Sequence, residues 1–152
     1  MKVKCIANTG QNLSPKSIEA GNTRNAEFDL RIGEIYVVYS MHLFKEAIEY
    51  LISKGPSEKP FWYPAEIFEV VDPLLPIQWY FCFKGYDTED KTRRDLLSAI
   101  WGYEEMALNP NHFVDLIERE PEALEIFFKQ KKEIDEYEEL NKFRKNNGKN
   151  SS

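Results

Sequence analysis

The sequence is poor in the residues that catalytic, metal-binding and disulfide-stabilised sites require. Its 152 residues include two cysteines and two histidines. Neither His42 nor His112 has a second histidine or a cysteine at the spacing of zinc ligands. Cys5 and Cys82 each lie in an apolar stretch, so we expect two reduced, buried thiols. We therefore expect no metal, no cofactor and no catalytic residue, and we interpret the protein as a non-enzyme.

Long apolar runs are missing as well. No run approaches the roughly 20 residues that a membrane-spanning helix needs. The first residues turn polar at Asn8, before the apolar region of a signal peptide could be complete. The expectation is a cytoplasmic protein that does not bind membranes.

The chain also has fewer positive than negative charges. The net charge is −6, and its distribution is uneven: −1 over residues 1–86, −9 over 87–140, and four positive charges without a negative one over 141–152. Binding to phosphates requires a basic face, so we do not expect nucleic acid as a direct partner. A basic protein partner fits this charge, and an acidic helical surface that merely interacts with solvent is the alternative.

The chain changes its pattern near Gly85. Before it, short β-branched and aromatic runs are separated by glycine, proline and asparagine, which is typical of strands. We expect strands at residues 2–7, 27–31, 35–39, 47–53 and 61–71, the last with an edge position or a break at Pro64. A doubly buried strand is expected at 78–83, and 41–45 is interpreted as a connection. The segment 47–53 also fits a helical face. Strands this short indicate a small, strongly bent barrel.

After Gly85 the apolar spacing becomes helical. A helix is expected to begin at Asp87 or Thr88 and to carry one apolar stripe over residues 96–106. Residues 109–111 should end it, a short helix should follow over 112–119, and Pro121 suits the first position of a last helix. The prediction is an α+β protein with a β-barrel at 1–86, an acidic helical extension packed on it at 87–140, and a disordered tail at 141–152.

Two groups of residues are candidates for partner binding. Trp62 and Tyr63 belong to an aromatic ensemble, and such rings are favoured anchors at interfaces. The favoured alternative is that these rings fill the barrel and its contact with the helices. The second group consists of carboxylates in the predicted helices, which would accelerate association with a basic partner. Its members are Asp87, Glu89, Asp90, Glu104, Glu105, Asp115 and Glu118.

Several segments also carry a family resemblance. Residues 28–30 and 33–39 (Phe-Asp-Leu, then Gly-Glu-Ile-Tyr-Val-Val-Tyr) resemble the opening of SH3-like barrels. Together with 61–72, Trp79-Tyr80-Phe81, 101–105 and 125–129, the chain looks like small bacterial immunity proteins of polymorphic and contact-dependent toxin systems, over most of residues 2–135.

This resemblance implies an SH3-like N-terminal barrel and a function without chemistry. The protein would bind a co-encoded toxin domain, basic and possibly a nuclease, and cover its active site in the cytoplasm of the producing cell. Interfaces in such proteins vary, so the resemblance assigns no interface residue and leaves the oligomeric state open. The rival hypothesis is an SH3-like peptide- or RNA-binding regulatory module that uses a groove at Trp62 and Tyr63. An enzyme of unrecognised type would need a pocket that joins a histidine to carboxylates.

Overall fold

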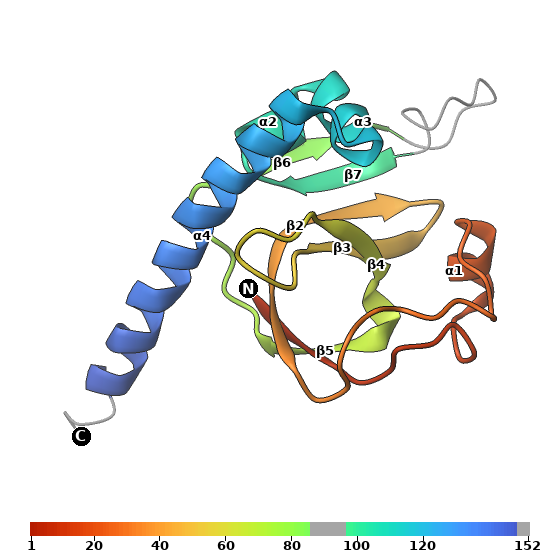
Figure 1. Cartoon of the computed structure of the whole chain (residues 1–152), viewed down its shortest axis with the longest axis horizontal. Coiled ribbons are helices and arrows are strands. Elements are labelled where there is room, and N and C mark those ends of the chain that lie inside the picture. The colour runs from red at the N-terminus through yellow and green to blue at the C-terminus, as the bar shows by residue number, and fades with distance from the viewer. Residues whose placement is uncertain (86–96, 149–152) are drawn as a thin grey trace.

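The computed structural model describes residues 1–85 and 97–148, with side chains through Lys142 (Figure 1). The described residues form a mixed α+β structure. Its strands are β1 (Lys2–Cys5), β2 (Ile35–Phe44), β3 (Ala47–Ile52), β4 (Phe61–Pro64), β5 (Phe68–Asp72), β6 (Tyr80–Phe83) and β7 (Leu97–Gly102). Its helices are α1 (Pro15–Glu19), α2 (Glu104–Leu108), α3 (Pro110–Glu118) and α4 (Pro121–Gly148), with a 3-10 turn η1 (Ala65–Ile67) between β4 and β5.

All strands pair antiparallel in one sheet that is organised around β2. The main path runs β4-β3-β2-β1-β5, and β7 pairs with β2 and β6. Residues 35–37 of β2 pair with β1, whereas residues 40–44 pair with both β3 and β7. In the described part of the chain no ladder joins β4 to β5, so the sheet is not a closed barrel.

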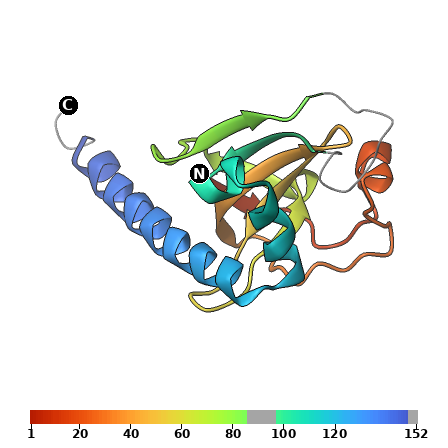
Figure 2. The same ribbon diagram turned by 90° about the horizontal axis from the view of Figure 1, so that it is seen from above.

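Strand alternation in the middle of this sheet separates two cores. Val38 of β2 and Ile52 of β3 belong to a core enclosed by β1 to β5. Their neighbours Tyr39 and Leu51 point to the opposite face, where they contribute to a second core beneath the helices. Figures 1 and 2 show α2 and α3 lying over β6 and β7, with α4 running past the side of the sheet. The helices are therefore held on the same strands that form the first core.

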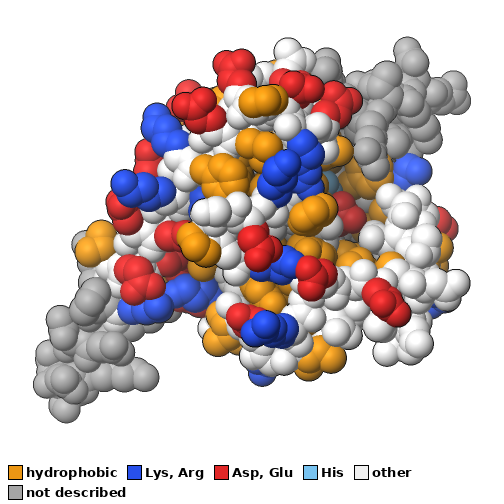
Figure 3. Space-filling view, in the orientation of Figure 1, with side chains coloured by type: hydrophobic (Ala, Val, Ile, Leu, Met, Phe, Trp, Pro, Cys, Tyr) orange, Lys and Arg blue, Asp and Glu red, His pale blue; other side chains and the backbone are white. Residues whose placement is uncertain are grey.

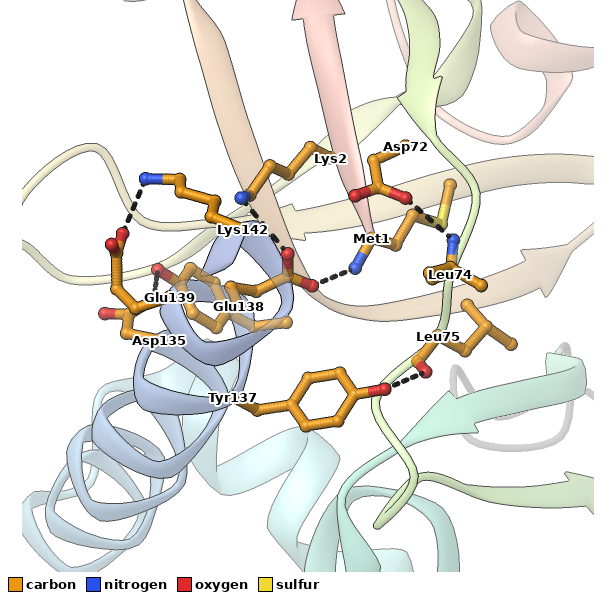
Figure 4. Close-up of polar contacts among 11 residues, drawn as sticks. Met1, Lys2, Asp72, Leu74, Leu75, Asp135, Tyr137, Glu138, Glu139 and Lys142 are labelled. Carbon is orange, nitrogen blue, oxygen red and sulfur yellow. Dashed lines mark hydrogen bonds and ion pairs between the residues drawn. The ribbon is translucent and has the colours of Figure 1, made fainter. Parts of the chain in front are cut away.

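Helix α4 is attached to the N-terminal strand by charged groups with little exposure (Figure 4). The Oε1 atom of Glu138 accepts from the Met1 amino group at 2.5 Å, and its Oε2 atom lies 3.2 Å from Lys2 Nζ. The hydroxyl of Tyr137 donates to the Leu75 carbonyl at 3.4 Å. These contacts hold the helix beside the sheet well beyond its first turns.

Several predicted elements are confirmed. Strands form within 2–7 and over most of 47–53, and the segment 61–71 is broken after Pro64, one of the two arrangements expected there. Helices α2 and α3 meet at Asn109, within the predicted stop, and α4 begins at Pro121. Pro64 ends β4, and Pro110 and Pro121 begin α3 and α4, because proline lacks an amide hydrogen.

Other predictions are wrong. Residues 27–31 form no strand and contribute one isolated bridge between Thr9 and Glu27. Residues 41–45 are mostly a continuation of β2 rather than a connection, because β3 and β7 supply partners on both of its edges. Strand β6 is not buried on both faces: its only ladder in the described chain is with β7, and Phe81 and Phe83 are more than half exposed.

The largest correction concerns the helical half. Residues 97–102 form β7 and not the middle of the helix predicted from Asp87 or Thr88, so the sheet continues beyond the boundary expected at 86/87. The predicted helix start at Asp87 or Thr88 lies outside the described residues. Helix α4 extends to Gly148, so the tail predicted from residue 141 is helical through that residue.

Candidate functional site

An acidic face covers the turn from α2 through α3 into the start of α4. Residues 104–128 contain seven carboxylates and one arginine, a net charge of −6 from this segment alone. We use "acidic face" for these seven residues: Glu104, Glu105, Asp115, Glu118, Glu120, Glu122 and Glu125. Figure 3 shows acidic side chains gathered over α2 and α3. Glu104 and Glu118 are exposed, and no ion pair involves either within the described chain.

The local sequence explains the positions of α2 and α3. Glu104 and Glu105 occupy the first turn of α2, where the helix dipole favours negative charge. Asn109 caps α3, its side-chain oxygen accepting from the Asn111 amide at 3.0 Å. The buried side chains of Met106 and Phe113 fix α2 and α3 on the second core. The carboxylates on α2 and α3 are thus carried by helices that pack on the second core.

A buried hydrogen bond joins the strand end to α3 behind the acidic face. The hydroxyl of Tyr103 and Nε2 of His112 are 2.7 Å apart, and both side chains are buried. Burial lowers the pKa of His112, although the nearby carboxylates of Glu105 and Asp115 act in the opposite direction.

The single arginine of this segment does not neutralise it. Arg119 has a left-handed backbone (φ 67°) just after α3, and its Nη1 atom donates to the Pro60 carbonyl at 2.5 Å. Its guanidinium lies 4.3 Å from the centre of the Phe61 ring. Among the described residues no carboxylate lies within salt-bridge distance of it. The arginine therefore belongs to a different site, next to the acidic face.

That site is a hollow of about 330 Å³ between the sheet and α3. Aromatic rings supply its walls: Trp62 stacks on His42 with ring centres 4.1 Å apart, and Phe113 lies 5.6 Å from Trp62. Phe44, Phe61 and Arg119 line it too. This volume is at the lower end of the range for small-molecule pockets.

A buried polar pair lies in the wall of the same hollow. His42 is 2% exposed, and its Nε2 atom lies 2.9 Å from Glu49 Oε2. An ionised carboxylate only accepts, so Nε2 donates and Nδ1 of the neutral ring keeps a lone pair. Within the part of the chain that the structure describes, Nδ1 has no hydrogen-bond partner, and the atom is shielded from solvent. Burial lowers the pKa of His42, while the hydrogen bond and the charge of Glu49 act in the opposite direction.

The structure brings together four of the seven carboxylates that the sequence suggested for partner binding. Glu104, Glu105, Asp115 and Glu118 come together on the acidic face, where Glu105 accepts from Gln130 Nε2 at 3.3 Å. The predicted residues Asp87, Glu89 and Asp90 lie outside the described chain.

The two predicted aromatic residues separate as well. Trp62 is partly buried and lines the hollow, whereas Tyr63 is 6% exposed in the first core and offers no surface for binding. Tyr63 and Trp62 are neighbours in β4, so alternation sends their rings to opposite faces.

Sequence reasoning missed the grouping of His42, Glu49 and Arg119. The alternation of β2 and β3 would place His42 and Glu49 on one face if 41–45 were read as a strand, because the two residues pair directly across the hairpin. Nothing in the sequence signals the approach of Arg119 to Pro60.

Comparisons with protein-family models, curated proteins and solved structures find no significant match to this chain. Within the described residues, no helix is both long enough and apolar enough to cross a bilayer. The same residues contain no group of three or more His, Cys, Asp or Glu side chains placed to hold a metal ion. The candidate site is therefore defined by its geometry alone, as an acidic face beside an aromatic hollow.

Proposed function

We propose that the protein is an immunity-type inhibitor that binds a basic toxin domain encoded beside it and covers the toxin's active site. The acidic face is the observation that supports this proposal most directly. Residues 104–128 carry seven carboxylates and one arginine, and the guanidinium of that arginine contacts the Pro60 carbonyl and the Phe61 ring. The electrostatic potential of this face is therefore expected to be negative. Such a field accelerates association with an oppositely charged protein and requires no chemistry from the inhibitor.

The finer description of the fold belongs to the same proposal. The strand order β5-β1-β2-β3-β4, with the 3-10 turn η1 between β4 and β5, supports an SH3-like N-terminal module. In this proposal β6 and β7 lengthen the sheet along β2, and the helices packed on that addition carry the acidic face.

An RNA-binding role for the groove at Trp62 has weaker support. Lys54, the nearest expected phosphate ligand, pairs with Asp29 and with Glu58. A cation already engaged by two carboxylates contributes little to phosphate binding. Lys59 is exposed and Arg119 lines the hollow beside Trp62, but these two cations do not make a basic face.

The test is growth rescue followed by binding kinetics. The products of the genes flanking this one are expressed in a bacterial host, with and without the chain. We expect one product to arrest growth and this chain to restore it. If neither product is toxic, or if the chain does not relieve the arrest, the proposal is wrong.

Charge reversal then tests the acidic face. The double variant Glu104→Lys/Glu118→Lys changes two exposed residues, and at low salt we expect association with the toxin domain to slow at least about tenfold, with the difference shrinking at high salt. Glu27→Lys, an exposed residue on the loop before β2, is the control and should change the rate little. Equal association rates for the double variant and the wild type would remove the acidic face from the mechanism.

A further inference from the structure

Strand β6 has the composition of a central strand but lies at the edge of the sheet. Its sequence is Tyr-Phe-Cys-Phe, without a charged residue. Within the described residues its only ladder is with β7, and Figure 2 shows β6 (green) as the outermost strand on that side. Natural proteins protect edge strands with a charge, a proline or a bulge. The strand β6 has none of these, so its outer edge is open to another strand.

The main chain of Phe81 points to this open edge. The Lys84 amide donates to the Ser98 carbonyl at 2.8 Å, in register with the pairing of β6 and β7. Hydrogen-bonded pairs alternate with non-hydrogen-bonded pairs along an antiparallel ladder. The pair of Cys82 and Ile100 is therefore hydrogen-bonded, whereas the N–H and C=O of Phe81 point away from β7.

Both faces of β6 are apolar and uncovered. Tyr80 is 44% exposed on one face, and Phe81 is 56% exposed on the other, where its ring centre lies 4.9 Å from that of Trp101. Ile77, just before the strand, is 84% exposed. A neighbouring strand would cover side chains on both faces at once, which a helix lying on one face of the sheet would not.

The charges around this edge favour a second copy of the chain as the neighbour. Strands β2, β6 and β7 contain no acidic and no basic residue, although the chain as a whole carries a net charge of −6. A basic partner finds no complementary charge on these strands. Two like-charged copies, by contrast, approach each other with least repulsion at an uncharged surface. Identical antiparallel strands are also self-complementary about a two-fold axis.

The exposed apolar area has the size of a reversible interface. An aromatic side chain has a surface of about 200 Å², so the half-exposed rings of Tyr80, Phe81 and Phe83 leave on the order of 300 Å² per copy. With Ile77 and the main chain of the strand, two copies would bury about 1,000 Å² in total, the size at which specific interfaces begin. We therefore expect a dimer that dissociates on dilution.

We propose that two copies of this chain pair antiparallel along β6, about a two-fold axis near Phe81, and so join their sheets into one. The main chain of Phe81 supplies hydrogen bonds to the second copy, and the rings of Tyr80 and Phe81 pack against it on the two faces. The dimer is independent of the proposed inhibitor function, since it uses none of the carboxylates of the acidic face.

The first experiment is sedimentation equilibrium of the full chain from about 1 to about 500 µM. We expect a monomer–dimer equilibrium with a Kd of about 100 µM or below. Because both copies carry a net charge of −6, the dimer should tighten as the salt concentration rises. Binding of a basic partner to the acidic face would weaken with salt, so the two associations respond in opposite directions.

Hydrogen exchange then locates the interface in the wild-type chain. The Phe81 amide should exchange at least about threefold more slowly at about 500 µM than at about 10 µM, because the second copy accepts its hydrogen bond. The Cys82 amide is the internal control: it faces β7 of its own chain and should exchange slowly at both concentrations.

Two matched variants complete the test. Phe81→Lys puts a charge on the open edge and should weaken the dimer at least about tenfold. Ile32→Lys makes the same kind of change at a 63% exposed apolar residue outside the patch and should dimerise like the wild type. Slow exchange of the Cys82 amide shows that Phe81→Lys is folded; if this variant does not fold, exchange of the wild-type Phe81 amide decides.

Three results would overturn the proposal. The first is a wild-type chain that stays monomeric at about 500 µM or forms open-ended oligomers instead of a dimer. The second is a folded Phe81→Lys variant that dimerises as tightly as the wild type. The third is exchange of the Phe81 amide that does not depend on protein concentration.

Discussion

Acid should destabilise this protein well before its carboxylates are protonated, because both histidines are buried. His42 and His112 are each 2% exposed, and burial lowers the pKa of both below the ordinary value. In the unfolded chain they titrate near pH 6.5. Between the lowered folded pKa and that value, the unfolded state binds more protons than the folded state. Stability is therefore complete above about pH 7 and falls as the pH falls through 6.5.

The magnitude follows from linkage. If both rings stay neutral in the folded state down to pH 5.5, the free energy of unfolding falls by about 2.5 kcal/mol between pH 7 and pH 5.5. This is an upper limit, because Glu49 favours the charged form of His42 and reduces its share. Such a loss is a large fraction of the 5–15 kcal/mol typical of a domain.

The assay is urea unfolding of the full chain at the two pH values. The control is the double variant His42→Gln/His112→Gln, whose side chains can form hydrogen bonds but do not titrate. We expect its free energy of unfolding to change by about 2 kcal/mol less between the two pH values than that of the wild type. If both proteins lose the same amount, or if the wild type loses less than about 0.5 kcal/mol, the histidines do not carry the acid sensitivity and the reasoning is refuted.

Two further predictions concern the support of the acidic face. Tyr103→Phe removes the hydroxyl that lies 2.7 Å from Nε2 of buried His112, and it should lower the free energy of unfolding by about 1–3 kcal/mol. The measurement is urea unfolding at pH 7. An unchanged urea midpoint would show that this hydrogen bond does not stabilise the packing of α3. Phe127→Ala empties a fully buried position against Tyr39 and should cost about 3–5 kcal/mol, whereas Leu140→Ala, at a 63% exposed position on the same helix, should cost less than about 0.5 kcal/mol. Equal losses for Phe127→Ala and Leu140→Ala would show that α4 is not packed at Phe127.

The two candidate sites depend on the same tertiary arrangement. Helix α3 contributes Asp115 and Glu118 to the acidic face and Phe113 to the wall of the hollow. Arg119, at its end, connects it to Pro60 before β4. Variants of the acidic face should therefore be limited to exposed carboxylates, so that the hollow and the core remain intact.

Local chemistry determined part of this structure from the sequence alone. The break at Pro64 and the helix start at Pro121 follow from a ring that fixes φ and removes an amide donor. The alternation of Lys2, Val3, Lys4 and Cys5 suffices to identify β1, because its buried and exposed faces are distinct. The excess of carboxylates over 104–128 is likewise a property of the sequence, and it places the acidic face on whatever elements that segment forms.

Tertiary structure alone decided the rest. The apolar spacing of residues 97–102 fits a helix, but β2 and β6 form hydrogen-bonded ladders on both sides of this segment. A short apolar run is compatible with either structure, and the two neighbouring strands decide for a strand. Burial of Tyr63 and exposure of Phe81 depend on which strands have neighbours. The hollow depends on residues far apart in the chain, since Arg119 meets Pro60 across 59 positions. The sequence determines where proline ends a strand or begins a helix, and it determines the charge of each segment, because these are properties of single segments. Strand partners and pockets arise from packing between segments that are distant in the chain.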